Sequence, residues 1–220
     1  YSMGGLWCDY ERTAAGGLNV GSPRNHQTNV SGLYAIGECD YQYHGANRLG
    51  GNGVANSTVF GAVAGDTMAE WVRSGRSFVD PDGASIEEAI SRCEKPLDAK
   101  TASHGSLEPL RERLYEVMWE KVGIIRDAAG LRAGLSELAA IEKDLGECGI
   151  ADANRAFNLT WHDWLNLRNL AETSRAIAEA ALARADSRGA HFREDFPEAG
   201  PLETSCYTSL QIRKSELNIA

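Results

Sequence analysis

Apolar residues recur at helical spacing through the second half of the chain. In residues 127–148 they follow one another at steps of three and four, which places them on one face of a helix; they are Leu131, Leu135, Leu138, Ile141 and Leu145. Comparable patterns cover residues 106–126 and 154–185. Three consecutive helices with one apolar stripe each predict an antiparallel three-helix bundle over residues 105–186, because each stripe is buried against the other two helices.

Residues at the expected helix ends support these limits. The first helix has a suitable N-cap followed by a proline in its first turn, and two glycines stand where the second helix should stop; they are Ser106, Pro109, Gly146 and Gly149. The tryptophans at helical spacing, Trp119, Trp161 and Trp164, are predicted to lie in the core.

Residues 1–75 have a different pattern, in which glycines separate short apolar runs. Glycine pairs at 4–5, 16–17 and 50–51 alternate with runs such as residues 32–37, which is typical of strands and tight turns. Residues 54–73 are mostly small or apolar and predict a helix buried on most sides and packed closely against a sheet.

The remaining segments are a connector and a tail. Residues 76–104 are mixed and polar, with a turn at 80–83 and a short amphipathic helix expected over residues 85–93. Residues 187–220 have no clear period, and from Phe192 onward we expect an extended or irregular tail. The chain is therefore predicted to belong to the α+β class.

Composition narrows the class of partner. The 220 residues include 31 acidic and 22 basic side chains, a net charge of −9, which argues against a nucleic-acid partner because such partners are bound by basic surfaces. Apolar runs such as residues 59–64 are far shorter than the ~20 residues that cross a bilayer. We expect a soluble protein, attached to a membrane at most peripherally.

The cysteines indicate neither a zinc site nor a disulfide framework. Five of them stand at wide, irregular spacing without a C-x-x-C pair. Reduced thiols in a cytoplasmic protein are the simplest interpretation, and the histidines His26, His104 and His162 lack partners at metal-ligand spacing.

Two segments could carry chemistry. Glu38 follows a short apolar run that ends at Gly37, so a ligand could approach the backbone while the acid accepts hydrogen bonds from sugar or ribityl hydroxyls. A buried strand with a surface glutamate explains this segment equally well.

The second segment, residues 44–54, is a glycine-rich loop that leads into the expected helix. A helix start offers unpaired N–H groups, and Arg48 upstream offers a planar fork suited to a carboxylate. The loop is neither a Walker loop nor the first motif of a dinucleotide fold. For Arg48 alone, a solvated or structural ion pair is the more common role of an arginine.

Four motifs together resemble the flavoprotein subunit of succinate dehydrogenase and fumarate reductase. They are Tyr-Ser-Met-Gly-Gly at residues 1–5, residues 28–38, residues 44–52 with His-Gly-Ala-Asn-Arg, and residues 187–197 with Ser-Arg-Gly-Ala-His-Phe-Arg-Glu-Asp-Phe-Pro. The resemblance covers residues 1 to about 198. It implies a partial FAD-binding, Rossmann-like segment followed by a helical C-terminal domain.

The resemblance also assigns roles. Glu38 matches the acid that binds FAD, and Arg48 matches the arginine that holds a substrate carboxylate. Gly53 and Val54 would lie at the pyrimidine edge of the flavin, although the family usually continues Asn-Ser-Leu-Leu where this chain has Asn52-Gly53-Val54-Ala55. His44 would face the substrate or buttress the loop through its ring nitrogens.

The last of the four motifs, residues 187–197, is expected to have a structural role; it is called the late motif. Arg188, His191 and Arg193 match it, and we expect them to tie the chain after the bundle back onto the flavin domain through bonds from arginine to carbonyls or carboxylates.

Other parts of the family's site would precede Tyr1. They are a substrate-binding histidine immediately before it, the first glycine-rich FAD motif, the histidine that anchors flavin covalently in many members, and the arginine that donates a proton. We therefore expect no catalytic residue of that kind here, no metal ligand, and a fragment that is inactive alone.

The expected function is interconversion of succinate and fumarate by hydride transfer with FAD. The resemblance implies an iron–sulfur subunit and a membrane anchor as partners, which would hold the protein at the inner face of the cell membrane. Two alternatives stand beside it: a related flavoenzyme similar to L-aspartate oxidase, and a non-catalytic helical interaction module.

Overall fold

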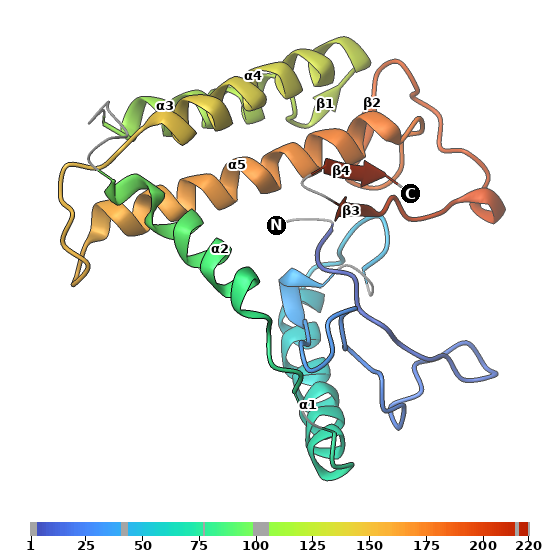
Figure 1. Cartoon of the computed structure of the whole chain (residues 1–220). Helices are drawn as coiled ribbons and strands as arrows, with labels where there is room; N and C mark the ends of the chain where they lie inside the picture. Colours follow the sequence, from blue (N-terminus) through green and yellow to red (C-terminus); the bar gives the residue numbers. More distant parts are fainter. Residues whose placement is uncertain (1–3, 41–43, 77, 99–105, 214–215, 220) are drawn as a thin grey trace. The chain divides into compact units, whose positions relative to one another are not determined.

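The structure is a computed structural model that describes residues 4–40, 44–76, 78–98, 106–213 and 216–219. Backbone contacts divide the chain into two compact units, Tyr1–Asp80 and Pro81–Ala220. Figure 1 shows the elements of both units.

The first unit is built mainly from turns. The regular elements among its described residues are the single-turn helix η1 (Gly37–Cys39) and the long helix α1 (Asn52–Arg73). Isolated backbone bridges join Leu6 to Asp40, Arg12 to Leu18 and Gln27 to Tyr34.

The prediction of a strand over residues 32–37 is wrong. Within the described part of the unit, Tyr34 makes one isolated bridge instead of belonging to a ladder. Gly37 has a φ of +73°, a left-handed conformation that turns the chain into η1. An apolar run without a continuous backbone partner on either side does not form a strand.

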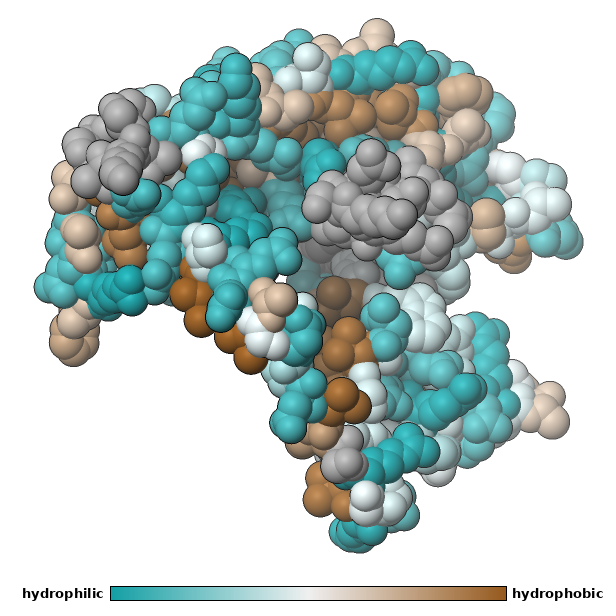
Figure 2. Space-filling model, in the orientation of Figure 1, coloured by the Kyte–Doolittle hydropathy of each residue, from teal (hydrophilic) through white to brown (hydrophobic). Residues whose placement is uncertain are grey.

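Helix α1 begins at Asn52, close to its expected start, and ends at Arg73 as expected. Its N-cap, Gly51, has a φ of +85°, which only glycine adopts at little cost. The helix buries one face rather than most sides, through Asn56, Ala64, Thr67 and Trp71. Apolar side chains on its other faces are exposed, and Figure 2 shows them among polar ones.

The second unit begins with helix α2 (Gly83–Glu94), which starts and ends close to the predicted limits. Asp82 caps it, because its Oδ1 accepts a hydrogen bond from the Ser85 N–H at 3.0 Å. The single turn η2 (Lys95–Leu97) follows. The apolar residues of α2, Ile86 and Ile90, are exposed in this unit.

Three longer helices follow: α3 (Glu108–Glu120), α4 (Ala128–Glu147) and α5 (Leu159–Ala183). Asp127 caps α4 by accepting from the Gly130 N–H at 2.6 Å, and Asn158 caps α5 by accepting from the Trp161 N–H at 2.8 Å. Local capping chemistry therefore fixes two of the starts.

The first of these helices is shorter than predicted. It ends at Glu120, and Ile125–Arg126 form strand β1, which pairs in parallel with β2 (Phe192–Arg193). Gly123 lies in the connecting turn, where a Cβ would come 2.3 Å from the Trp119 carbonyl oxygen. The chain reverses too tightly there for the helix to continue.

The core of this unit confirms the leucine stripe. Helix α4 packs against both α3 and α5, as Figure 1 shows, and Leu131, Leu138, Ile141 and Leu145 are all buried. Trp164 is buried and donates its indole N–H to the Leu145 and Cys148 carbonyls. Trp119 is exposed, so its predicted place in the core is wrong.

The tail contains more regular structure than its sequence predicts. After β2 and the turn η3 (Leu202–Thr204), strands β3 (Leu210–Arg213) and β4 (Glu216–Ile219) form an antiparallel pair. Leu210 stands opposite Ile219, and Arg213 stands opposite Glu216.

Candidate functional site

Two predicted site residues meet in the first unit. Glu38 lies in η1, Arg48 lies in the loop before α1, and the Arg48 Nη1 donates to the Glu38 Oε2 at 3.2 Å. The Arg48 side chain is 23% exposed and that of Glu38 is 52% exposed. The pair is therefore partly shielded and still open to a ligand.

The start of α1 presents backbone donors beside this pair. The Asn52 N–H is bonded to the Leu49 carbonyl and the Ala55 N–H to the Gly51 carbonyl. The N–H groups of Gly53 and Val54 lie in the first turn and have no acceptor within the helix. They are suited to an electron-rich oxygen, because the positive end of the helix dipole lies at the same place.

His44 is held by the helix that follows it. Its Nε2 lies 3.1 Å from the Nδ2 of Asn56, and Asn56 is buried on α1. In this orientation of the amide, the Asn56 nitrogen donates and the His44 Nε2 accepts. This contact supports the buttressing interpretation without testing whether His44 also faces a substrate.

Asn56 was missed by the sequence reasoning. A polar residue on the buried side of a mostly apolar helix was the available signal. Its neighbour Ser57 donates to the Gly53 carbonyl at 3.1 Å and so supports the first turn of α1.

Two buried groups of this unit have pKa values shifted by their surroundings. Burial lowers the pKa of His26, whose Nδ1 lies 4.0 Å from the Asp40 Oδ2 and whose ring lies 5.2 Å from that of Phe60. Burial, together with the nearby Asp40 carboxylate, raises the pKa of the Cys8 thiol to about 12. His26 is therefore neutral, and Cys8 is a thiol rather than a thiolate.

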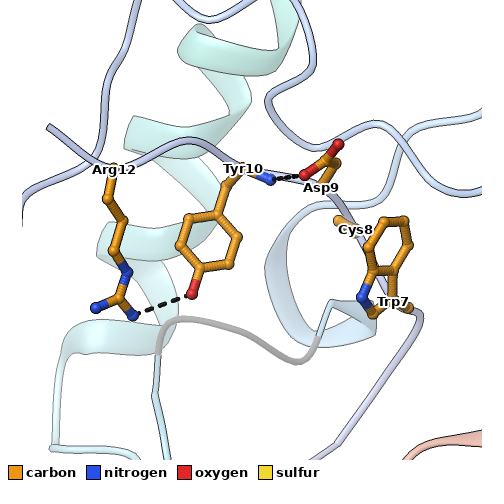
Figure 3. Close-up of a pocket in the computed structure, with 5 residues that line it drawn as sticks. All are labelled: Trp7, Cys8, Asp9, Tyr10 and Arg12. Atoms are coloured by element: carbon orange, nitrogen blue, oxygen red, sulfur yellow. Dashed lines mark hydrogen bonds between the residues drawn. The ribbon is translucent and has the colours of Figure 1, made fainter.

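A hollow of about 340 Å³ lies elsewhere in the unit. Figure 3 shows its lining, in which Arg12 donates to the Tyr10 hydroxyl and the Tyr10 N–H donates to Asp9; the lining residues are Trp7, Cys8, Asp9, Tyr10 and Arg12. It is open, and none of the predicted site residues lines it.

Within the described residues there is no group of three or more side chains that could hold a metal ion. None of the described helices is both long enough and apolar enough to span a bilayer.

The late motif encloses a buried arginine. Arg193 is 1% exposed, and its guanidinium forms two bonds of 2.7 Å to Asp195. Its Nη1 also donates to carbonyls at the end of α5, at 2.9 to 3.1 Å; they belong to Ala181, Leu182 and Arg184. Arg193 therefore caps the C-terminus of α5.

His191 makes a second connection in the same motif. Its Nδ1 lies 2.9 Å from the Arg126 Nη1 and its Nε2 lies 3.3 Å from the Arg184 carbonyl. Arginine can only donate, so Nδ1 accepts and Nε2 carries the proton. Arg188 donates to the Gly200 carbonyl.

The late motif makes structural bonds within the helical unit. Bonds of Arg188, His191 and Arg193 run to carbonyls, Asp195 and Arg126 of that unit. These bonds close the helical unit on itself, and the expected tie to the flavin domain stays a prediction.

Family models match both units. An FAD-binding domain matches residues 1–54, and the C-terminal domain of the fumarate reductase flavoprotein matches residues 111–218. The chain belongs to the succinate dehydrogenase and fumarate reductase flavoprotein family.

Relatives of this family align with most of the chain. An uncharacterized FAD-dependent oxidoreductase of Methanocaldococcus jannaschii is 36% identical over 83% of this chain and 32% of its own length. The succinate dehydrogenase flavoprotein subunit of Bacillus subtilis is 30% identical over 90% of this chain and 32% of its own length. The chain thus spans about a third of the length of these curated relatives.

The fold agrees with a solved flavoprotein. A quinol–fumarate reductase structure with menaquinol molecules superposes on 100% of this chain and 36% of its own, with a TM-score of 0.81 and 26% identity. Both the turn-rich unit and the helical unit therefore have counterparts in one chain of that quinol–fumarate reductase structure.

Proposed function

We propose that this chain forms part of a flavoprotein oxidoreductase that interconverts succinate and fumarate, with FAD as its cofactor. The observation that carries the proposal is the Arg48–Glu38 pair at the start of α1, within the segment that matches an FAD-binding domain. The Arg48 guanidinium, which would bind a carboxylate, lies in the loop before α1. The N–H groups of Gly53 and Val54, which would bind the flavin edge, lie in the first turn of the same helix.

The residues present fit FAD. Glu38 offers a half-exposed carboxylate, which accepts hydrogen bonds from sugar or ribityl hydroxyls. The first-turn N–H groups of Gly53 and Val54 have no acceptor within the helix and would hold the carbonyl oxygen at the pyrimidine edge. When bound, FAD would accept the hydride that leaves succinate, and its reduced form would donate the hydride that reaches fumarate.

Arg48 would hold one carboxylate of the dicarboxylate. Its planar guanidinium donates two parallel hydrogen bonds, which fix the direction as well as the position of the substrate. His44, held by Asn56 at 3.1 Å, would face the same carboxylate or keep the loop in place. In an acidic chain with a net charge of −9, attraction of a dianion depends on this local cation.

We also propose the finer architecture and assembly that the family suggests. Helices α3, α4 and α5, which share one core, would form an antiparallel three-helix bundle domain. The complete protein would act with an iron–sulfur subunit and a membrane anchor, and would lie at the inner face of the cell membrane through them. The name of one relative supports this assembly: the Bacillus subtilis protein is called a subunit, and a subunit acts together with other chains.

The test is Arg48→Ala in the complete flavoprotein. We expect kcat/KM for succinate and fumarate to fall by about 30-fold or more, the effect of losing one charged contact to a carboxylate. Arg48→Lys should recover only part of this loss, because an ammonium does not form the two parallel bonds. Steady-state kinetics in both directions measure the effect.

Arg24→Ala is the matched control. Arg24 belongs to the same unit and also forms an ion pair at 3.2 Å, with Asp9. Its loss should leave kcat/KM within about twofold, since an exposed pair contributes little. If Arg48→Ala behaves like Arg24→Ala, the proposed role of Arg48 is wrong.

A further inference from the structure

Asn56 is a polar residue on the buried face of α1. It is 3% exposed, and Thr67, on the same helix, is 4% exposed. The Thr67 hydroxyl donates to the Val63 carbonyl at 2.9 Å, so its hydrogen bond stays within the helix. The amide of Asn56 instead contacts the loop before the helix, through the His44 ring at 3.1 Å. Asn56 therefore connects α1 to that loop.

The amide of Asn56 is only partly satisfied. With Nδ2 toward His44, the Oδ1 atom is buried and has no hydrogen-bond partner among the described residues. Turning the amide over would pair Oδ1 with a proton on the His44 Nε2 and leave Nδ2 without that partner. A buried polar atom without a partner destabilises a fold, and an apolar side chain of similar shape avoids this cost. Stability of α1 alone therefore does not account for an asparagine here, whereas the contact with His44 does.

The contact ties down the first residue of the loop that carries Arg48. This loop, residues 44–51, starts at His44 and ends at Gly51, the N-cap of α1. Gly45, next to His44, has a φ of +61°, and among the described residues no heavy atom lies within 4 Å of its Cβ position, so packing at Gly45 does not hold this end. Through Asn56, both ends of the loop are attached to the same helix. A loop held at both ends has fewer conformations, which lowers the cost of ordering it around a ligand.

We propose that Asn56 is a positioning residue, which through His44 anchors the loop that carries Arg48 and thereby raises the affinity for a dicarboxylate. The inference rests on the proposed function, in which Arg48 binds a substrate carboxylate. The pair with Glu38 is a further attachment of Arg48, so loss of the Asn56 contact loosens the guanidinium without releasing it. Two parallel hydrogen bonds to a carboxylate are sensitive to a displacement of about 0.5 Å. The effect therefore falls on substrate binding rather than on folding.

The experiment uses the complete, flavin-loaded protein. Its variants are Asn56→Leu, Asn56→Ala, His44→Ala, the double variant of Asn56→Leu with His44→Ala, and Arg48→Ala. The dissociation constant of malonate, a dicarboxylate without a carbon pair to oxidise, is measured from the change in flavin absorbance. Flavin content, thermal midpoint, and KM and kcat for succinate are measured on the same samples. Thr67→Val is the matched control, because it also replaces a buried polar residue of α1 by an apolar one, and the hydroxyl it removes bonds within the helix.

We expect Asn56→Leu and Asn56→Ala to weaken malonate binding by about threefold or more and to raise KM with little change in kcat, as loss of ground-state binding does. The thermal midpoint of Asn56→Leu should not fall, because the buried polar atom is gone and the half-buried His44 ring can bond to water. Thr67→Val should leave malonate binding unchanged. In the His44→Ala background, Asn56→Leu should have no further effect, because its partner is missing.

Each other outcome overturns the inference. If both Asn56 variants bind malonate within about threefold of the parent while Arg48→Ala does not, the inference is wrong and the proposed function stands. If Asn56→Leu weakens binding equally with and without His44, or acts by releasing flavin, Asn56 does not act through His44. A joint fall of kcat and thermal midpoint in both Asn56 variants would mark a residue that only supports the fold. If Arg48→Ala itself leaves malonate binding unchanged, both the function and the inference fail.

Discussion

The two units of this chain are stabilised in different ways. The helical unit buries a continuous apolar core between α3, α4 and α5; its members include Leu114, Leu131, Leu138, Ile141 and Ala178. The turn-rich unit buries many polar side chains instead, among them Ser22, Asn25, His26, Thr28, Asp40 and Asn56. Among its described residues, isolated bridges and turn hydrogen bonds hold the backbone before α1, rather than a sheet.

This difference gives the two units different roles: the helical unit contributes packing, and the turn-rich unit carries the proposed binding groups. A close-packed apolar core holds one arrangement and has few groups that can react. The turn-rich unit leaves backbone donors, a guanidinium and a carboxylate at its surface, and these are the groups that a ligand needs. The packing therefore indicates that stability depends more on the helical unit than on the turn-rich unit.

The largest expected effect is that of Arg193→Ala. The substitution leaves Asp195 without its cation and removes the donor of three carbonyls at the end of α5. We expect a loss of about 3 kcal/mol in the free energy of unfolding, measured by urea denaturation with far-UV circular dichroism. Arg113→Ala is the control, because its pair with Asp144 is exposed and should contribute less than about 1 kcal/mol. Equal losses for both variants would contradict the capping role.

A smaller effect comes from one substitution made in each unit. Val117 in α3 is 3% exposed, whereas Val59 in α1 is 56% exposed. Val117→Ala should cost about 2 kcal/mol, because it removes buried methyl groups and leaves a cavity, and Val59→Ala should cost less than about 0.5 kcal/mol. The same denaturation experiment compares them. A larger loss for Val59→Ala would show that the exposed face of α1 is covered in the protein as it exists.

The smallest effect is a dependence on pH. Burial, and then the nearby Arg126, Arg184 and Arg193, lower the pKa of His191 from its ordinary value of 6.5. Because the unfolded chain then binds the proton more readily, the contribution of His191 is complete above pH 6.5 and decreases as the pH falls below it.

His191→Gln should reduce this dependence in the helical unit, since glutamine does not titrate. Free energies of unfolding measured between about pH 5.5 and 7.5 give the slope. His26→Gln is the matched variant in the other unit, where burial also lowers the histidine pKa. An unchanged slope in His191→Gln would mean that His191 does not stay neutral in the folded protein.

The helices could be predicted because their signals are local. The leucine stripe of α4 and the acid at position 127 lie within one helix length, so spacing alone defines the element. The β1–β2 pair could not be predicted in this way, since Ile125 and Phe192 are far apart in sequence and each strand has two residues. The prediction for Trp119 was wrong for a related reason: its helical spacing suggested burial, but the described residues leave its side chain 76% exposed.

The sequence names the residues of the candidate site but not their geometry. The glycine-rich loop and the acid after Gly37 indicated Arg48 and Glu38 separately. Their ion pair depends on the conformation of the loop before α1, which brings the two side chains to 3.2 Å. Spacing in the sequence does not encode this arrangement.

The Asp195 carboxylate also bears on how the protein is made. It accepts from the Ala128 N–H at the start of α4, and through Arg193 it reaches the end of α5. During synthesis the helical segments leave the ribosome before residues 193–195 do, so α5 lacks its C-terminal cap until then. A nascent chain that stalls just before this motif should carry helices with a preformed core and an open end, and it should be the species that chaperones and proteases meet.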